Sequence, residues 1–374
     1  MCSGAEASRP AAPIFALLIV IFSRDTHDGN LLVSAWQEIG MPDQSLPYQV
    51  MEVTTERAVL YLDLTPDVDD SLTEVITGLS SDFQVLPSKL FYDKAGSILF
   101  DQITKLDEYY PTRTERMLLE SIVGEIKEEL PDDVILVEYG SGSSEKTHDL
   151  LRKIDSISTY IPIDISREHL LKAAERIKMD FPSLTVLPVC ADYSARIDLG
   201  LEDVASEQFA VFFPGSTIGN FERTDAINFL VRIREMLGRG GHLMIGVDLK
   251  KSLDILLPAY NDSLGVTAAF NLNILAHINR RFDSNFILDH FSHEATYNEI
   301  DGRIEMYLVA DVDMVVDVGD CSFSFRSGDK ICTEYSHKYT LKEFEVLADQ
   351  AGFDVTRAWT DEANLFSFQL LVAR

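Results

Sequence analysis

The hydrophobic pattern between residues 134 and 247 alternates between short apolar runs and amphipathic segments. The apolar runs are rich in β-branched and aromatic residues, as buried strands are, and lie at 134–139, 159–163, 184–189, 209–213 and 242–247. Between them, helical spacing of apolar residues covers 146–153, 167–181 and 223–237. We therefore predict an α/β fold with a parallel, doubly wound sheet.

The pattern on either side of this region predicts further elements. Helices are expected at 72–77, 97–106, 114–129, 267–280 and 341–351. One face of the third helix carries four apolar residues, namely Met117, Leu118, Ile122 and Ile126. β-like runs follow the fourth helix at 303–315 and 322–326, and two more strands end the chain at 353–358 and 365–372. We expect the last two strands to complete the sheet as an antiparallel pair.

Breaks in this rhythm divide the chain into three parts. We predict a poorly ordered N-terminal extension at 1–45, a sheet domain formed by 113–250 plus 341–374, and a second α+β domain formed by 46–112 plus 251–340. The extension contains nine consecutive apolar residues at 14–22. A transmembrane helix needs about 20 such residues, and the flanks differ from those of a secretory signal. We therefore expect no membrane anchor there.

Charge and cysteine content narrow the class of protein. The 374 residues carry a formal net charge of −29, which disfavours nucleic-acid and membrane partners and suits a small zwitterionic or cationic substrate. The four cysteines form no CxxC pair, so we expect free thiols in a reducing cytoplasm and no metal site. We expect a cytoplasmic monomer.

A glycine-containing turn follows the strand at 134–139. Glu138 precedes Gly140 and Gly142, and the next helix starts near Lys146. Glycine has no Cβ, so a ligand can approach the backbone closely. A dinucleotide site would have a third glycine where this chain has Glu145, and an acid at a helix start disfavours a pyrophosphate. S-adenosylmethionine (SAM) is the alternative that this acid-x-Gly-x-Gly turn favours, whereas a plain strand–helix turn needs no ligand.

Two later strand ends carry carboxylates. Ligands bind beyond the carboxyl ends of strands in an open α/β sheet. Asp164 is placed to accept hydrogen bonds from ribose hydroxyls, and the alternative is that it caps the next helix. Ser166 is also a candidate N-cap for that helix. Asp192 is placed to accept from an adenine amino group beside Tyr193, unless it is a turn aspartate. Lys146 either contacts the cofactor or is a solvated lysine.

Longer motifs resemble the histidine Nα-methyltransferases of ergothioneine biosynthesis. They cover 46–374 in matching order and lie at 91–97, 99–101, 108–113, 139–147, 215–221, 259–262, 265–271, 303–306 and 333–336. The resemblance implies a class I (Rossmann-like) SAM-dependent methyltransferase domain and a family-specific domain that encloses the substrate. It implies a cofactor site formed by Gly140, Gly142, Lys146, Asp164, Asp192 and Tyr193.

The same resemblance implies a substrate pocket lined by Tyr92, Tyr109, Asn220, Tyr260, Met306, Glu334 and Ser336. Tyr92 and Asn220 are the implied catalytic residues: Tyr92 lies nearest the amine, and Asn220 holds the amino and carboxylate groups together. Tyr260 donates to the carboxylate. Glu334 accepts from an imidazole N–H, and Ser336 serves the other ring nitrogen. Alternating strand positions put Glu334 and Ser336 on one face, which is also how a solvated strand face looks.

The activity that the resemblance implies is trimethylation of L-histidine to hercynine in three successive transfers. Fungal relatives that methylate prenylated tryptophan lack the polar pair that Glu334 and Ser336 provide here. Gly215-Ser216-Thr217 stands where the family commonly has Gly-Gly-Thr, and Tyr193 where it has Phe. Two alternatives remain open, namely a methyltransferase of the same fold acting on another amino acid such as tryptophan, and a non-catalytic SAM-binding subunit.

Overall fold

The computed structural model describes residues 61–64, 68–193, 197, 199 and 205–374. The predicted extension at 1–45 and the apolar run at 14–22 lie outside the described residues. Among the described residues, none of the helices combines the length and the apolar character needed to cross a membrane.

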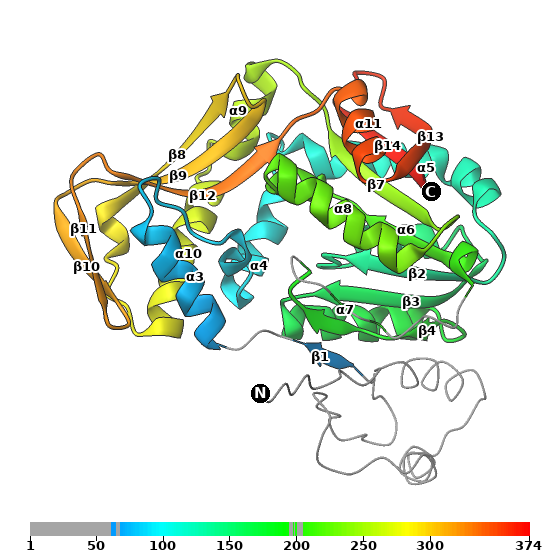
Figure 1. Cartoon of the computed structure of the whole chain (residues 1–374), viewed down its shortest axis with the longest axis horizontal. Helices are drawn as coiled ribbons and strands as arrows, with labels where there is room; N and C mark the ends of the chain where they lie inside the picture. The colour runs from blue at the N-terminus through cyan, green and yellow to red at the C-terminus, as the bar shows by residue number, and fades with distance from the viewer. Residues whose placement is uncertain (1–60, 65–67, 194–196, 198, 200–204) are drawn as a thin grey trace, which may run out of the picture.

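The described residues form a nine-stranded sheet with the order β1-β5-β3-β2-β6-β7-β14-β13, and β4 pairs with β3 (Figure 1). Its strands are β1 Leu62–Leu64, β2 Val134–Tyr139, β3 Ile157–Asp164, β4 Thr185–Val186, β5 Val189–Ala191, β6 Phe209–Phe213, β7 His242–Asp248, β13 Phe353–Thr360 and β14 Phe366–Ala373. Pairing is parallel except where β14 joins β7 and β13. The α/β fold and its antiparallel end pair are confirmed.

Helices cover both faces of this sheet because its strands are apolar on both sides. They are α5 Tyr110–Glu129, α6 Glu145–Leu151, α7 Arg167–Asp180, α8 Arg223–Leu237 and α11 Leu341–Gln350. In β2, Ile135 and Val137 join the core under α8 and α11, whereas Leu136 joins the core under α5, α6 and α7. β2 lies between β3 and β6, at the point where the strand order reverses. That point is where open α/β sheets bind ligands.

Three local predictions were wrong in detail. Met117 on α5 is 70% exposed, whereas Leu118, Ile122 and Ile126 are buried. The strand expected at 184–189 is divided into β4 and β5, and Pro188 between them has no N–H for a sheet hydrogen bond. Ser166 occupies the N-cap position of α7, but its side chain makes no capping hydrogen bond.

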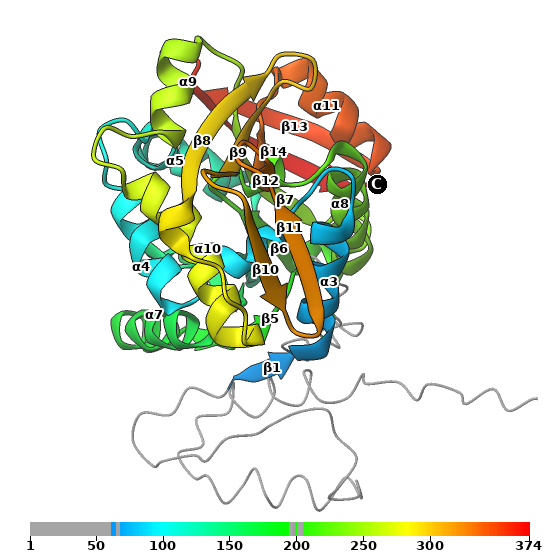
Figure 2. The ribbon, with the colours of Figure 1, turned by 90° about the vertical axis from the view of Figure 1, so that its left-hand side faces the viewer.

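The remaining elements surround a second core. They are α3 Val68–Ser80, α4 Lys94–Ile103, α9 Leu253–Tyr260, α10 Val266–Phe282, β8 Phe291–Asn298, β9 Arg303–Ala310, β10 Met314–Val318, β11 Cys321–Phe325 and β12 Lys330–His337. Short 3-10 turns are η1 Ser88–Phe91, η2 Ser206–Gln208, η3 Thr217–Asn220 and η4 Leu288–His290. β12, β9 and β8 form an antiparallel sheet, and Figure 2 shows the β10–β11 hairpin between α10 and α3.

The second core brings together distant parts of the chain. Val75, Leu90 and Phe91 pack in one cluster with Phe270 and Ile331. Most of the predicted second domain therefore shares this core. One strand differs from the prediction, because β1 lies within 46–112 and yet pairs with β5 of the large sheet. The division of the chain into two domains by residue range stays a prediction.

Candidate functional site

A cavity of about 400 Å³ lies between the carboxyl ends of the large-sheet strands and the segment from η1 to α5. All six predicted cofactor residues and three of the predicted substrate residues line it: Tyr92, Tyr109, Gly140, Gly142, Lys146, Asp164, Asp192, Tyr193 and Asn220. Tyr260, Met306, Glu334 and Ser336 do not line this cavity. Tyr260 and Glu334 contact the lining residues Tyr109 and Asn220, respectively. Met306 lies opposite Glu334 in the strand register, and Ser336 is hydrogen-bonded to Tyr260.

The glycine turn after β2 is tied to the loop after β3 through Asp164. Gly140 and Gly142 have φ angles of +68° and +50°, which favour glycine. The N–H of Gly142 donates to Asp164 Oδ2 at 2.9 Å, and the N–H of Ser166 donates to Oδ1 at 2.8 Å. Burial raises the pKa of Asp164, and these N–H groups oppose the rise. Each carboxylate oxygen has a second lone pair, so the carboxylate keeps capacity for ligand hydroxyls.

Asp192 and Tyr193 lie at the end of β5 on the same side of the cavity. Asp192 is 8% exposed and accepts from Lys89 Nζ at 2.9 Å. The ring of Tyr193 packs edge-on against Tyr139 at 6.2 Å and lies beside Gly140. Lys89 was missed at the sequence level, because no local pattern links a lysine on η1 to an acid 103 positions away.

Lys146 is anchored to a buried acid. Its Nζ pairs with Glu115 on α5, whose side chain is 0% exposed. Glu115 also accepts from the N–H of Gly215 at 2.8 Å, so it joins α5, α6 and the loop after β6. The alternative of a solvated lysine is therefore wrong. A direct contact between Lys146 and a cofactor stays a prediction.

Aromatic side chains form the opposite wall. The ring of Tyr92 packs against Phe100 at 5.9 Å and Phe270 at 6.0 Å, and Tyr109 packs against Tyr260 at 6.3 Å. Burial raises the pKa of Tyr92 and Tyr109 well above the usual value for a phenol. Both therefore carry neutral hydroxyl groups near pH 7, which donate and accept hydrogen bonds without being strong bases.

Asn220 links the cavity to β12. Its Nδ2 donates to Glu334 Oε1 at 2.8 Å. The close approach of η3 and β12 requires glycine, because a Cβ at Gly219 would lie 2.7 Å from the carbonyl oxygen of His337. Met306 on β9 is opposite Glu334 in the strand register and is 2% exposed. Burial raises the pKa of Glu334 to about 7, although Lys338 and the Asn220 amide lower it.

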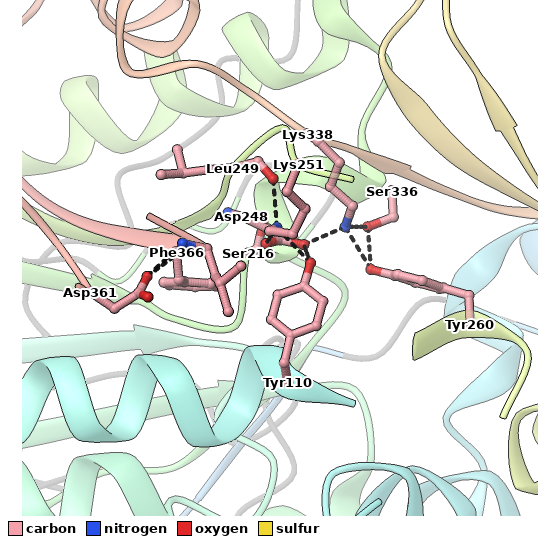
Figure 3. A network of polar contacts seen from close by, with 11 residues as sticks. Tyr110, Ser216, Asp248, Leu249, Lys251, Tyr260, Ser336, Lys338, Asp361 and Phe366 are labelled. Carbon is pink, nitrogen blue, oxygen red and sulfur yellow. Dashed lines mark hydrogen bonds and ion pairs between the residues drawn. The ribbon is translucent and has the colours of Figure 1, made fainter. Parts of the chain in front are cut away.

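A buried polar network joins Tyr260 and Ser336 to Lys338 and Asp248 (Figure 3). The Tyr260 and Ser336 hydroxyl oxygens are 2.8 Å apart, and Lys338 Nζ donates to both. Lys338 also pairs with Asp248 Oδ2 at 2.8 Å, and both side chains are 0% exposed. The sequence held two signals for these missed residues. Lys338 continues the alternation of Glu334 and Ser336, and Asp248 is a further acid at a strand end.

Comparisons with known proteins agree on one family. A family model described as "Histidine-specific methyltransferase, SAM-dependent" matches residues 71–373. The "Histidine N-alpha-methyltransferase" of Mycolicibacterium smegmatis is 39% identical over 80% of this chain and 94% of its own length. That of Mycobacterium tuberculosis is 38% identical over 79% and 93%, respectively. "Ergothioneine biosynthesis protein 1" of Neurospora crassa is 32% identical over 76% of this chain and 33% of its own length.

Proposed function

The chain belongs to the family of SAM-dependent, histidine-specific methyltransferases, and from this premise we propose that it methylates the α-amino nitrogen of L-histidine in ergothioneine biosynthesis. The observation that carries the proposal is the shared cavity. One side presents the glycine turn with Asp164 and Asp192, and the other presents Tyr92, Tyr109 and Asn220. A nucleoside and an amino acid bound on these two sides would meet inside one cavity.

The cofactor side fits SAM. The backbone at Gly140 is open to a ligand, and the carboxylates of Asp164 and Asp192 suit ribose hydroxyls and an adenine amino group. Tyr193 offers an aromatic face beside that turn. SAM supplies an electrophilic sulfonium methyl group. We assign no metal to the site. The cysteine pattern of the sequence supports a cytoplasmic location, and we propose that the protein is a monomer.

The substrate side suits histidine. Asn220 has both a donor and an acceptor for the amino and carboxylate groups, and Tyr260 is a further donor for the carboxylate. Glu334 accepts from an imidazole N–H, while Ser336 lies on the same face of β12 for the other ring nitrogen. Tyr109 and the apolar Met306 border the ring. The hydrogen bond from Asn220 to Glu334 joins the part of the pocket that binds the amino and carboxylate groups to the part that binds the ring.

Methyl transfer needs a neutral amine aligned with the sulfonium methyl, so positioning supplies most of the catalysis. The reference pKa of an α-amino group is about 8, so a fraction is neutral at physiological pH. The neutral phenol of Tyr92 accepts a hydrogen bond from the amine and orients its lone pair. Three successive transfers would yield the trimethylated product, whose quaternary ammonium group the faces of Tyr92 and Tyr109 can hold.

The proposal is tested by mass spectrometry of L-histidine incubated with the protein and SAM. Mono-, di- and trimethylhistidine should appear in succession, and S-adenosylhomocysteine should accumulate in step. Parallel incubations with tryptophan test the alternative substrate class. Methylation of tryptophan in preference to histidine, or turnover of neither, would contradict the proposal.

Replacing Tyr92 with phenylalanine should lower kcat for histidine by about 10-fold, because it removes a hydroxyl partner of the amine and keeps the ring. Affinity for trimethylhistidine should change less than about 3-fold, because a quaternary ammonium has no N–H and is held by aromatic faces. The kcat for histidine and the affinity for trimethylhistidine are measured on one preparation of the variant. Tyr297→Phe on β8 is the matched control, because Tyr297 does not line the cavity. Equal losses of turnover and product affinity would mean that Tyr92 acts through pocket shape alone.

A further inference from the structure

Lys338 is a fully buried lysine that directly follows β12. Its ammonium pairs with Asp248 at 2.8 Å, and the side chains of both residues are 0% exposed. Lysine is almost never fully buried without a partner, and a buried ion pair adds little stability once desolvation is counted. The contacts of the ammonium with other groups therefore call for a role beyond stability.

The ammonium has three donors, and three acceptors surround it (Figure 3). Besides Asp248 Oδ2, it donates to the Tyr260 hydroxyl at 2.7 Å and to Ser336 Oγ at 2.8 Å. An ammonium group cannot accept a hydrogen bond, so both hydroxyl oxygens must be acceptors toward Lys338. Lys338 therefore determines which atom is the donor in each of these two hydrogen bonds. A neutral partner that can both donate and accept would not determine it.

Each hydroxyl group still has its own proton to donate. The Tyr260 and Ser336 oxygens lie 2.8 Å apart, so without a substrate one hydroxyl donates to the other. A substrate that offers an acceptor to each group replaces this bond. Both protons then point away from Lys338, because one lone pair of each oxygen is already occupied by the ammonium.

We propose that Lys338 is a specificity-determining positioning residue that makes Tyr260 and Ser336 hydrogen-bond donors to the substrate. This inference rests on the proposed function. Tyr260 donates to the histidine carboxylate, and Ser336 donates to the imidazole nitrogen that has no proton, while Glu334 accepts from the other. The pocket thereby selects a neutral ring with one donor and one acceptor nitrogen. An indole has an N–H but no acceptor nitrogen, so the ring offers nothing to the Ser336 hydroxyl and this contact between pocket and substrate is lost.

Asp248 holds Lys338 in place and also has a second cation. Lys251 Nζ lies 2.5 Å from Asp248 Oδ1, and the Tyr110 hydroxyl donates to Oδ2 at 2.6 Å. Burial alone would raise the pKa of Asp248, but the ammonium groups of Lys338 and Lys251 bring this pKa below its usual value. Removing Lys338 therefore leaves the carboxylate paired, and the variant is expected to fold.

The test compares Lys338→Met with Lys251→Met, which removes the other ammonium from the same carboxylate without touching Tyr260 or Ser336. Lys338→Met should raise KM for histidine by about 10- to 100-fold, and Lys251→Met by less than about 3-fold. The Kd of S-adenosylhomocysteine, measured by calorimetry, should stay within about 2-fold in both. If Lys338 acts through Ser336, then Ser336→Ala should cost far less in the Lys338→Met background than in the wild type.

An unchanged KM for histidine in Lys338→Met would overturn the inference. So would a double variant in which the fold-changes of Lys338→Met and Ser336→Ala simply multiply, because the two residues would then act independently. If Lys338→Met does not fold, the inference is tested on the wild-type protein with a substrate analogue. A histidine analogue whose five-membered ring keeps the N–H but has carbon in place of the acceptor nitrogen should lose about 100-fold in kcat/KM, and equal use of both compounds overturns the inference. A wild type that methylates neither compound contradicts the proposed function itself, which separates the two failures.

Discussion

Replacing Glu334 with alanine should lower kcat/KM for histidine by about 100- to 1,000-fold, because a polar ring left without its partner is strongly rejected by an enclosed site. The substitution removes the acceptor for the imidazole N–H. It also removes the acceptor of the Asn220 amide at 2.8 Å, so the group that holds the backbone of the substrate loses its orientation. Glu334→Gln keeps one acceptor oxygen and should fall between alanine and the wild type.

The measurement is kcat/KM for histidine and tryptophan in each variant. Glu294→Ala on β8 is a matched control, because it removes a glutamate that pairs with Lys330 at 2.7 Å and does not line the cavity. The preference for histidine over tryptophan should fall with Glu334→Ala and stay constant with Glu294→Ala. Wild-type kcat/KM for histidine in Glu334→Ala would show that the imidazole contact is wrongly assigned.

Glu334 should make the folded protein less stable as the pH rises. Its pKa is about 7 in the folded protein, against 4.5 for a glutamate in solution. Between these pH values the folded state holds a proton that the unfolded state has released, so a rise in pH favours unfolding. Glu334→Gln removes this loss. Relative to the wild type, its free energy of unfolding should therefore increase between pH 4 and pH 8, by an amount on the order of 1–3 kcal/mol. Denaturant unfolding at both pH values measures this difference.

Replacing Asp164 with alanine should weaken SAM binding by about 100-fold. The variant loses the proposed ribose contact and two acceptor positions for backbone N–H groups, those of Gly142 at 2.9 Å and Ser166 at 2.8 Å. Hydrogen bonds to a charged group are stronger than neutral ones, and the glycine turn loses its link to the loop after β3. Calorimetry with S-adenosylhomocysteine measures the affinity without turnover.

Two further variants separate the contact with the cofactor from general damage. Asp164→Asn keeps one acceptor oxygen and should bind the cofactor with intermediate affinity. Asp180→Ala removes an exposed aspartate at the end of α7 that pairs with His148, so its affinity should match the wild type. An Asp164→Ala protein that is folded and binds S-adenosylhomocysteine with wild-type affinity would reject the ribose role.

Most secondary-structure elements were predictable because their signals are local. β2 and β6 occupy the residues expected from their apolar runs, since strands buried on both faces in a parallel sheet are apolar along their whole length. One error came from the helical period itself. The pattern placed Met117 on the buried face of α5, but at 3.6 residues per turn it lies on the side opposite Ile126, and its side chain is 70% exposed.

The cofactor side of the site was more predictable than the charges that support it. Gly140, Asp164 and Asp192 lie at the carboxyl ends of β2, β3 and β5, and the carboxyl ends of parallel strands meet at one edge of a sheet. The partners of the charged groups were not predictable in this way. Glu115 pairs with Lys146 from another helix, and Lys89 pairs with Asp192 across 103 positions. No pattern within either segment specifies such a pair.

By itself, the sequence determined where the strands end and which chemical groups stand there, because strand length and glycine turns depend on neighbouring residues. Only the tertiary structure decided which of those groups face one another. Packing β12 against η3 brings Glu334 to Asn220, and the placement of Lys338 beside the end of β7 gives Asp248 its buried cation. Such contacts depend on the three-dimensional paths of segments about 90 or more positions apart, and burial then makes a paired charge the stable arrangement.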